Sequence, residues 1–239
     1  MPELLTLAPG VEVVRPDDGT RLRYSGDEVE LVRNFFSLLV FGQNEWAGQP
    51  FVLSAWEEEA IRQFYGVQAR DEDGTWSRYR RYLYEEIPKK NGKSEFAAGL
   101  GLYHLIADGE ARPQVGIFAA DKTNADIIYQ CAKYMVEHTA LGQPEHDSLV
   151  WCRDSVREIR SRDGGVMKVY SSDASTKHGF SFSAIIIDEL HAQPNRRLWD
   201  VLTAGSDAAR RQQAVIVLTT IYSGVEYFTK NLDVLSDVK

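Results

Sequence analysis

The segment IPKKNGKS (87–94) contains residues of the types needed to hold a phosphate group. Gly92 lets the backbone approach a phosphate closely, and a helix starting there would present free N–H groups and a partial positive charge. Lys93 could then reach the β- and γ-phosphates of a nucleotide, and the Ser94 hydroxyl could bind Mg²⁺. The full pattern G-x-x-x-x-G-K-[ST] has glycine where this chain has Ile87. The motif alone is therefore also compatible with an ordinary helix start.

A second group that could do chemistry is the pair Asp188 and Glu189, which follows the apolar run AIII (184–187). At the carboxyl end of a strand, the first carboxylate can hold Mg²⁺ and the second can polarise an attacking water. A buried strand that merely ends at acidic surface residues is the alternative. The two motifs lie 95 residues apart (188 minus 93) and in the order that a nucleotide hydrolase requires. Together they predict nucleotide hydrolysis.

Alternating strands and helices must position these groups. The pattern predicts strands over 81–87, 115–120, 183–188 and 214–220, helices over 92–107 and 123–138, and an antiparallel pair around the turn 162–165. Apolar strands separated by helix-length segments indicate a mostly parallel sheet with helices on both faces. Thr219 and Thr220 would end at the same edge as the acidic pair, where a hydroxyl can sense the γ-phosphate. Ordinary strand preference for threonine is the alternative.

The first 50 residues have a different character. Residues 1 to about 26 are rich in Pro, Gly and Asp and predict an extended arm, whereas apolar residues at helical spacing predict an amphipathic helix over 27–41. A capping box from Ser54 to Glu57 opens a second helix through Tyr65, and DEDG (71–74) predicts a turn. We therefore divide the chain into an arm and helix over 1–50 and an α/β domain over 51–239.

Composition limits the class of protein. The 239 residues are 44% hydrophobic and 26% charged, typical of a soluble globular protein with a substantial core. No run approaches the roughly 18 apolar residues that span a bilayer, so we expect no membrane association. Cys131 and Cys152 lack metal-like spacing and are expected to be reduced. A net charge of -8 argues against nucleic acid binding over the whole surface, although arginines cluster at 78–81, 153–162, 196–197 and 210–211.

Several strings together resemble the ATPase motor of tailed-phage terminase large subunits, whose phosphate loop lacks the first glycine. They are IPKKNGKS, SSDASTKHGF, AIIIDELHA, and VLTT preceded by an arginine pair, within a likeness that runs from about 49 to 223. The resemblance implies an α/β P-loop NTPase fold of the ASCE type, with Walker A and Walker B motifs. It also implies ATP and Mg²⁺ as ligands, and hydrolysis that moves double-stranded DNA into a procapsid.

The resemblance also implies roles for individual residues. Lys93 and the general base Glu189 would be catalytic, and Ser94 and Asp188 would hold the metal. The nucleotide would contact Lys89, Lys90, Asn91, Gly92, Lys93, Ser94, Phe51, Trp56, Glu57, Thr219 and Thr220. Lys89 stands where many members have arginine, and it keeps the charge without the planar fork. Glu57 stands where an adenine-contacting amide is expected, with its capping role as the alternative.

A ring motor often inserts an arginine from one subunit into its neighbour's site. We expect Arg210 or Arg211 to act in this way. Some terminases place an Arg-Gly pair before the acidic strand, where this chain has Lys177, His178 and Gly179, and this region is the alternative source.

The resemblance further implies partners: double-stranded DNA, a portal protein, a small terminase subunit, and copies of the chain in a ring, all in the host cell cytoplasm. We expect the isolated domain to be monomeric. The chain ends at Lys239, before the nuclease that follows in full-length relatives, so we expect ATP hydrolysis without DNA cleavage. A helicase-like ATPase of another class and a non-enzymatic interaction module are the competing hypotheses.

Overall fold

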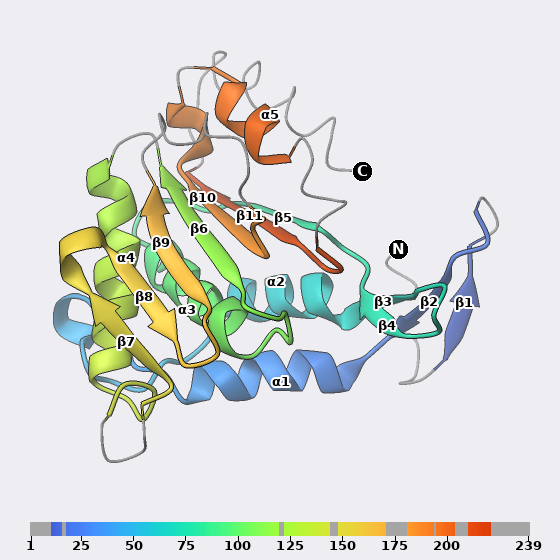
Figure 1. The fold of residues 1–239 in the computed structure, drawn as a ribbon, viewed down its shortest axis with the longest axis horizontal. Helices are drawn as coiled ribbons and strands as arrows, with labels where there is room; N and C mark the ends of the chain where they lie inside the picture. The colour runs from blue at the N-terminus through green and yellow to red at the C-terminus, as the bar shows by residue number, and fades with distance from the viewer. Residues whose placement is uncertain are drawn as a thin grey trace.

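The structure, a computed structural model, describes residues 11–15, 18–119, 122–143, 148–170, 181–193, 195–203 and 210–220. A seven-stranded sheet in the order β5-β11-β10-β6-β9-β8-β7 forms its centre (Figure 1). Its strands are β5 (Tyr82–Glu86), β6 (Gln114–Ala119), β7 (Val150–Arg153), β8 (Glu158–Ser161), β9 (Val166–Tyr170), β10 (Ala184–Asp188) and β11 (Ala214–Thr219). A smaller sheet contains β1 (Glu12–Val14), β2 (Arg21–Tyr24), β3 (Val67–Arg70) and β4 (Trp76–Arg78).

Five α-helices are described: α1 (Gly26–Ser37), α2 (Ala55–Gly66), α3 (Lys93–Ile106), α4 (Lys122–Glu137) and α5 (Arg197–Thr203). Three short 3-10 helices are also described: η2 (Asn44–Trp46), η4 (Asp154–Val156) and η6 (Leu190–Ala192). None of the helices described in the structure is both long and apolar enough to cross a membrane.

The larger sheet is mostly parallel, as predicted. Strands β5, β11, β10, β6 and β9 all run in one direction, β8 runs antiparallel to β9, and β7 runs antiparallel to β8. All five residues of β10 and all six of β11 are buried, because both faces of these strands are covered. The predicted antiparallel pair around 162–165 is confirmed as β8 and β9.

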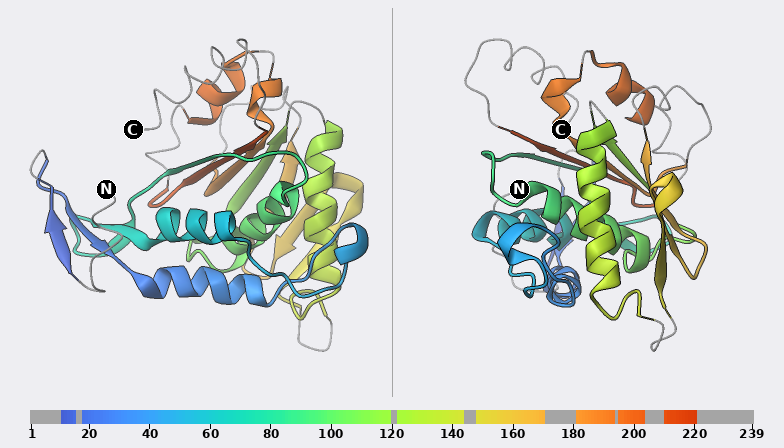
Figure 2. Two further views of the ribbon diagram at one scale, coloured as in Figure 1. Left: turned by 180° about the vertical axis from the view of Figure 1, so that it is seen from behind. Right: turned by 90° about the vertical axis from the view of Figure 1, so that its left-hand side faces the viewer.

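Helices cover both faces of the sheet (Figure 2). The main core lies between one face and α1 to α4, and includes Phe36, Phe96, Ile128 and Ile186. On the other face, α5 packs against β10 and β11. Its contributing residues are Leu198, Trp199 and Leu202, and those of β10 are Ile185 and Ile187. Nearly the whole of α3 is buried. The helix that follows the loop is therefore held rigidly in the molecule.

The N-terminal segments differ from the prediction in two respects. Part of the expected arm forms β1 and β2, and β2 pairs antiparallel with β3. The first helix ends at Ser37 rather than Phe41. It ends there because the chain turns back on itself, so that the N–H groups of Phe41 and Phe51 bond to the carbonyl oxygens of Gln49 and Leu39. Helix α1 and the turn after it thus share the core of the larger domain, through Val29, Val32, Phe35, Phe36 and Leu39.

Candidate functional site: a phosphate loop facing an acidic strand end

The loop between β5 and α3 is exposed from Pro88 to Gly92 and is braced from within. The side-chain amide of Asn91 donates to the carbonyl oxygens of Pro88 and Lys89 at 3.1 and 3.2 Å. Lys90 and Gly92 have φ of 66° and 79°, a region that glycine adopts without strain. Gly92 is also the N-cap of α3, and no side chain caps this helix end. The N–H groups of the first turn are therefore available to an anion.

Lys93 folds its side chain back over this loop. Its ammonium donates to the carbonyl oxygens of Ile87 at 3.3 Å and Pro88 at 3.5 Å. The same nitrogen lies 3.9 Å from Oε1 of Glu189. The structure thus brings the predicted phosphate-binding lysine and the predicted general base together.

Strand β11 makes this meeting possible because it lies between β5, which leads into the loop, and β10, which leads into the acidic pair. Leu218 pairs with Asp188, and Thr219 pairs with Glu86. The carboxyl ends of all three strands are therefore level at one edge. The order of the strands therefore brings the loop, the acidic pair and the two threonines to the same edge of the sheet, as predicted.

Glu189 has a constrained backbone and a well-bound side chain. Its φ of 49° places it in the left-handed region, which costs a non-glycine residue about 1 kcal/mol or more. Its carboxylate accepts from the backbone N–H of Thr220 at 2.8 Å and from the Thr220 hydroxyl. The end of β11 therefore holds the carboxylate in position.

His191, to which no role was assigned from the sequence, belongs to the same cluster. Its Nδ1 lies 3.2 Å from Oε2 of Glu189 and 2.8 Å from the hydroxyl oxygen of Thr219. The signal available in the sequence was its place two residues after Glu189. A lone histidine in a chain carries little information by itself, so only the structure reveals its partners.

Ser94 and Asp188 are the residues that could hold Mg²⁺. Ser94 lies in the first turn of α3, and the nearly buried Asp188 ends β10 at the same edge of the sheet. Hydroxyl and carboxylate oxygens suit this cation, which also keeps water and substrate phosphate as ligands. Within the described residues, no cluster of three His, Cys, Asp or Glu side chains could hold a metal by itself. The donor set therefore fits a cation that arrives with a phosphate.

The two aromatic residues expected to contact the nucleotide, Phe51 and Trp56, pack against other aromatic rings. Phe51 is buried, stacked on Phe41 with ring centroids 4.4 Å apart and in edge contact with Phe36. Trp56 lies edge-on to Phe96 of α3, with a centroid distance of 5.1 Å. In this structure Trp56 therefore packs against α3, and Phe51 packs against α1 and the turn that follows it.

Glu57 forms the predicted capping box, which confirms that interpretation. Its Oε2 accepts from the Ser54 backbone N–H at 2.6 Å and from the Ser54 hydroxyl at 2.8 Å. Its Oε1 would lie 3.5 Å from a Cβ on Gly92, so the carboxylate also borders the phosphate loop. Burial raises the pKa of Glu57 above its ordinary value, more than the Ser54 hydrogen bonds lower it.

Arg210 and Arg211 lie just before β11, at the sheet edge opposite the phosphate loop. Arg210 donates to the carbonyl oxygen of Ala111 at 2.8 Å and pairs with Glu110 at 3.4 Å. Arg211 is more exposed and pairs with Asp71 at 3.0 Å. The structure does not bring either arginine to the loop of its own chain. Lys177 and His178 lie outside the described residues.

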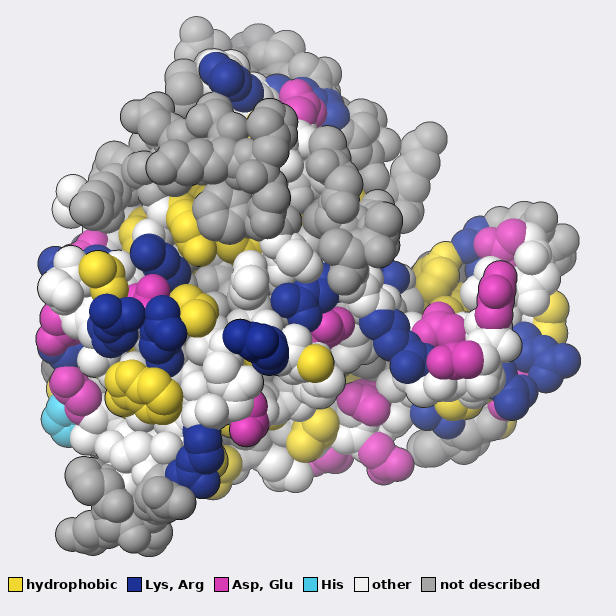
Figure 3. Space-filling model, viewed as in Figure 1, with side chains coloured by type: hydrophobic (Ala, Val, Ile, Leu, Met, Phe, Trp, Pro, Cys, Tyr) yellow, Lys and Arg dark blue, Asp and Glu magenta, His cyan; other side chains and the backbone are white. Residues whose placement is uncertain are grey.

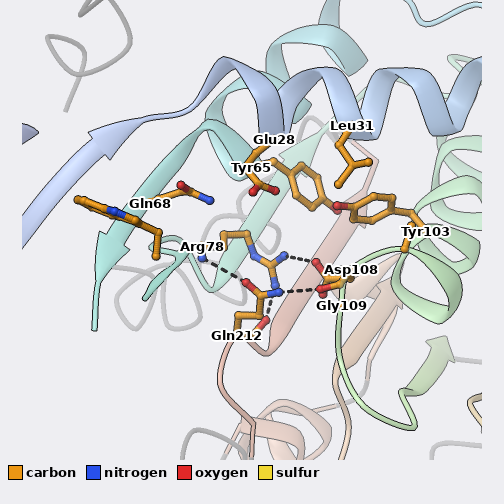
Figure 4. A pocket seen from close by; sticks show the side chains of 11 residues that line it. Glu28, Leu31, Tyr65, Gln68, Arg78, Tyr103, Asp108, Gly109 and Gln212 are labelled. Atoms are coloured by element: carbon orange, nitrogen blue, oxygen red, sulfur yellow. Dashed lines mark hydrogen bonds and ion pairs between the residues drawn. The ribbon is translucent and has the colours of Figure 1, made fainter. Parts of the chain in front are cut away.

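A small pocket occupies this opposite edge (Figure 4). It encloses about 230 Å³ between α1, the smaller sheet and the segment before β11. In its wall, the buried Arg78 pairs with Asp108 at 3.0 Å, and Nε2 of Gln212 donates to the Asp108 carbonyl oxygen at 2.8 Å. The lining residues are Glu28, Leu31, Tyr65, Gln68, Trp76, Arg78, Tyr103, Ala107, Asp108, Gly109 and Gln212.

The fold and the site define a class of protein. A loop ending in Gly92 and Lys93, an extra strand between the two motif-bearing strands, and Glu189 after the strand-ending Asp188 are the features of a P-loop NTPase of the ASCE type. The family model for the terminase large subunit ATPase domain matches residues 56–227. The chain belongs to this family, and this membership supports nucleotide use and ATPase activity in general.

Solved structures of other proteins are also similar to this chain. The large terminase of bacteriophage HK97 is similar with a TM-score of 0.67 and 21% identity, over 87% of this chain and 40% of that chain. The large terminase ATPase domain of Thermus phage P74-26 has a TM-score of 0.45 and 15% identity, over 63% of this chain and 64% of that chain. The chain thus spans 40% of the length of the HK97 protein. No curated protein matches the chain.

Proposed function

We propose that this chain hydrolyses ATP at the phosphate loop and that hydrolysis drives double-stranded DNA into a viral procapsid. The 3.9 Å approach of the Lys93 ammonium to the Glu189 carboxylate supports the first part. It joins the two motifs at one point of the sheet edge. Family membership supports the second part.

Each residue of the site has a task in this proposal. The N–H groups at the start of α3 and the ammonium of Lys93 bind the β- and γ-phosphates. Ser94 and Asp188 hold Mg²⁺, which would neutralise charge on the phosphate oxygens. Glu189 accepts the proton of the attacking water, and the hydrogen bonds from Thr220 orient its carboxylate.

Replacing Glu189 with Gln tests the hydrolysis step. Glutamine keeps an acceptor for the Thr220 N–H but cannot take a proton, so we expect hydrolysis to fall by about 100-fold or more while Mg-ATP affinity changes little. Glu30→Gln is the matched control, because Glu30 is an exposed partner of Arg33 on α1. Single-turnover hydrolysis and calorimetry separate the two effects. Wild-type turnover in Glu189→Gln would remove Glu189 from the base role.

The ring and its partners extend this proposal. A portal protein, a small terminase subunit and further copies of the chain would assemble around DNA in the host cell cytoplasm. Arg211 suits action on a neighbouring subunit better than Arg210, because its guanidinium is exposed and Arg210 is bound to backbone oxygens. Mixing Lys93→Ala with Arg211→Ala subunits tests this assignment. Activity that appears only in the mixture supports a trans-acting Arg211, and none appearing contradicts it.

A further inference from the structure

Among the described elements, helices contact only one side of β7, β8 and β9. Helix α4 contacts β7 and β9, and α3 contacts β9. These contacts are made through the buried side that carries Val150, Ile159 and Met167. Figure 2 shows, for the described elements, no helix over the outward side of these three strands. This side is therefore open to a partner.

Cationic side chains and a tryptophan occupy this outward side. Cross-strand pairing places Trp151 opposite Arg160, Arg153 opposite Glu158, and Glu158 opposite Lys168, and residues directly opposite each other share a face. Figure 3 shows Lys and Arg gathered with hydrophobic side chains over these strands. We call this surface the basic face and define it by the exposed Trp151 and Arg153 and the partly exposed Arg160, Val166 and Lys168.

A single buried carboxylate organises the basic face. Glu158 accepts from Arg160 and from Arg153, the latter at 3.1 Å, and Lys168 lies 3.8 Å away. The Glu158 side chain is only 6% exposed, whereas those of Arg153 and Arg160 are 48% and 43% exposed. Three cations therefore surround one covered anion, and the surface has an excess of two positive charges on a chain whose net charge is -8.

We propose that the basic face binds the phosphate backbone of double-stranded DNA. This inference rests on the proposed function and adds the surface that holds the transported polymer. Arginine and lysine bind phosphate without regard to base sequence, as a motor moving along any DNA requires. Glu158 holds the cations in position beforehand, which reduces the entropy lost on binding. The chemistry fits a polyanion because the only carboxylate within the face is covered.

Salt dependence of DNA binding tests the proposal. A fluorescent duplex of mixed sequence is titrated with the wild-type chain and with Arg160→Gln, from 50 to 200 mM salt. Each phosphate contact contributes about 0.9 to the slope of log K against log salt. We expect the slope to fall by about 0.9 and the affinity at 0.1 M salt to fall by about 8-fold. Lys168→Gln should behave in the same way.

Arg33→Gln is the matched control. Arg33 on α1 also pairs with carboxylates, those of Glu30 and Glu58, and its side chain is 35% exposed. Equal losses in both variants would overturn the proposal, because they would report net charge rather than a surface. An Arg160→Gln variant that bound DNA as tightly as the wild-type chain would also overturn the proposal. This conclusion would hold even if sedimentation showed that the variant self-associates differently.

The same variants separate this proposal from the proposed function. Hydrolysis in the absence of DNA should be unchanged in Arg160→Gln, because Arg160 lies outside the phosphate site. A wild-type chain that binds DNA through the basic face but never hydrolyses ATP would contradict the proposed function alone. A chain that hydrolyses ATP but shows no difference between Arg160→Gln and Arg33→Gln would contradict the basic face alone.

Discussion

The carboxylate of Glu189 has the side chains of Thr220 and His191 as neighbours. Thr220, which follows β11, donates to it, and His191 of η6 lies 3.2 Å away. A general base must be placed to within a fraction of an ångström to act well. His191 is therefore a positioning residue for the proposed hydrolysis.

Substitution of His191 should separate positioning from binding. We expect His191→Ala to lower kcat by about 10-fold or more with little change in KM for ATP, because the geometry of Glu189 loosens while the phosphate loop is untouched. Asparagine presents an amide nitrogen near the place of Nδ1, so His191→Asn should recover much of the rate. Steady-state kinetics on both variants decides. An equal loss in both would indicate a packing role.

Glu57 illustrates a carboxyl group whose charge is costly. Burial raises its pKa, so the folded chain loses stability as pH rises from the unfolded pKa of Glu57 through its folded pKa. Glutamine can replace glutamate in a capping box, so Glu57→Gln should raise Tm at pH 7.5. Each kcal/mol corresponds to about 2–4 °C in a chain of this size. The gain should shrink as pH falls, and a gain independent of pH would refute this account.

At the scale of elements, β11 connects the acidic pair to the phosphate loop. Its last residues pair with β5 on one side and β10 on the other, and the hydroxyl of the following Thr220 binds Glu189. Thr220→Val keeps the shape and removes this bond. Hydrogen bonds to charged groups contribute about 1.5–3 kcal/mol, so kcat should fall by about 10-fold or more. Thr220→Ser should retain most activity, and single-turnover rates compare the three proteins.

The contact between α1 and α3 depends on a glycine. A Cβ on Gly99 would lie 2.4 Å from a ring carbon of Phe36, closer than packing allows. Gly99→Ala should therefore lower the free energy of unfolding by about 1–3 kcal/mol. Gly26→Ala is the control, because a Cβ there meets nothing within 4 Å. Urea unfolding of the two variants measures the difference, and equal stabilities would show that α1 adjusts freely.

Long, strongly patterned elements could be predicted from the sequence, as could the short pair β8 and β9 from the turn between them, whereas other short strands could not. The run AIIID and the helix after Gly92 appear within a residue or two of their predicted bounds. Strands β3 and β4 have four and three residues, which is too few for a pattern. The pairing of β2 with β3 joins residues more than forty positions apart in the sequence. The motifs predicted which groups meet at the sheet edge. The contacts of His191 could not be predicted, because they depend on the order of strands.

At the scale of the whole molecule, a buried ion pair connects the smaller sheet to the larger domain. Arg78 of β4 pairs with Asp108 after α3, and His104 Nδ1 lies 2.8 Å from the same carboxylate. Burial alone would raise the pKa of Asp108, but the charges and hydrogen bonds of Arg78 and His104 hold it below its ordinary value. This pair contributes stability at neutral pH.

Removing the carboxylate should expose that contribution. Asp108→Asn leaves the Arg78 charge buried without its partner, which costs about 3–5 kcal/mol. Because the folded pKa of Asp108 is depressed, the wild-type chain should lose stability as pH falls below the unfolded pKa of about 3.9. The variant should lack this part of the loss. Urea unfolding from pH 7 to pH 3 measures both, and parallel curves would contradict the assignment.

The contacts of Lys93 bear on how the protein would release ADP. Its ammonium already has two carbonyl oxygens and a carboxylate as neighbours, so an arriving triphosphate exchanges one set of oxygens for another. We expect this exchange to weaken nucleotide affinity compared with a lysine left in solvent. It should also ease the departure of ADP, because the amine has somewhere to return. Repeated hydrolysis should therefore be limited less by the release of ADP.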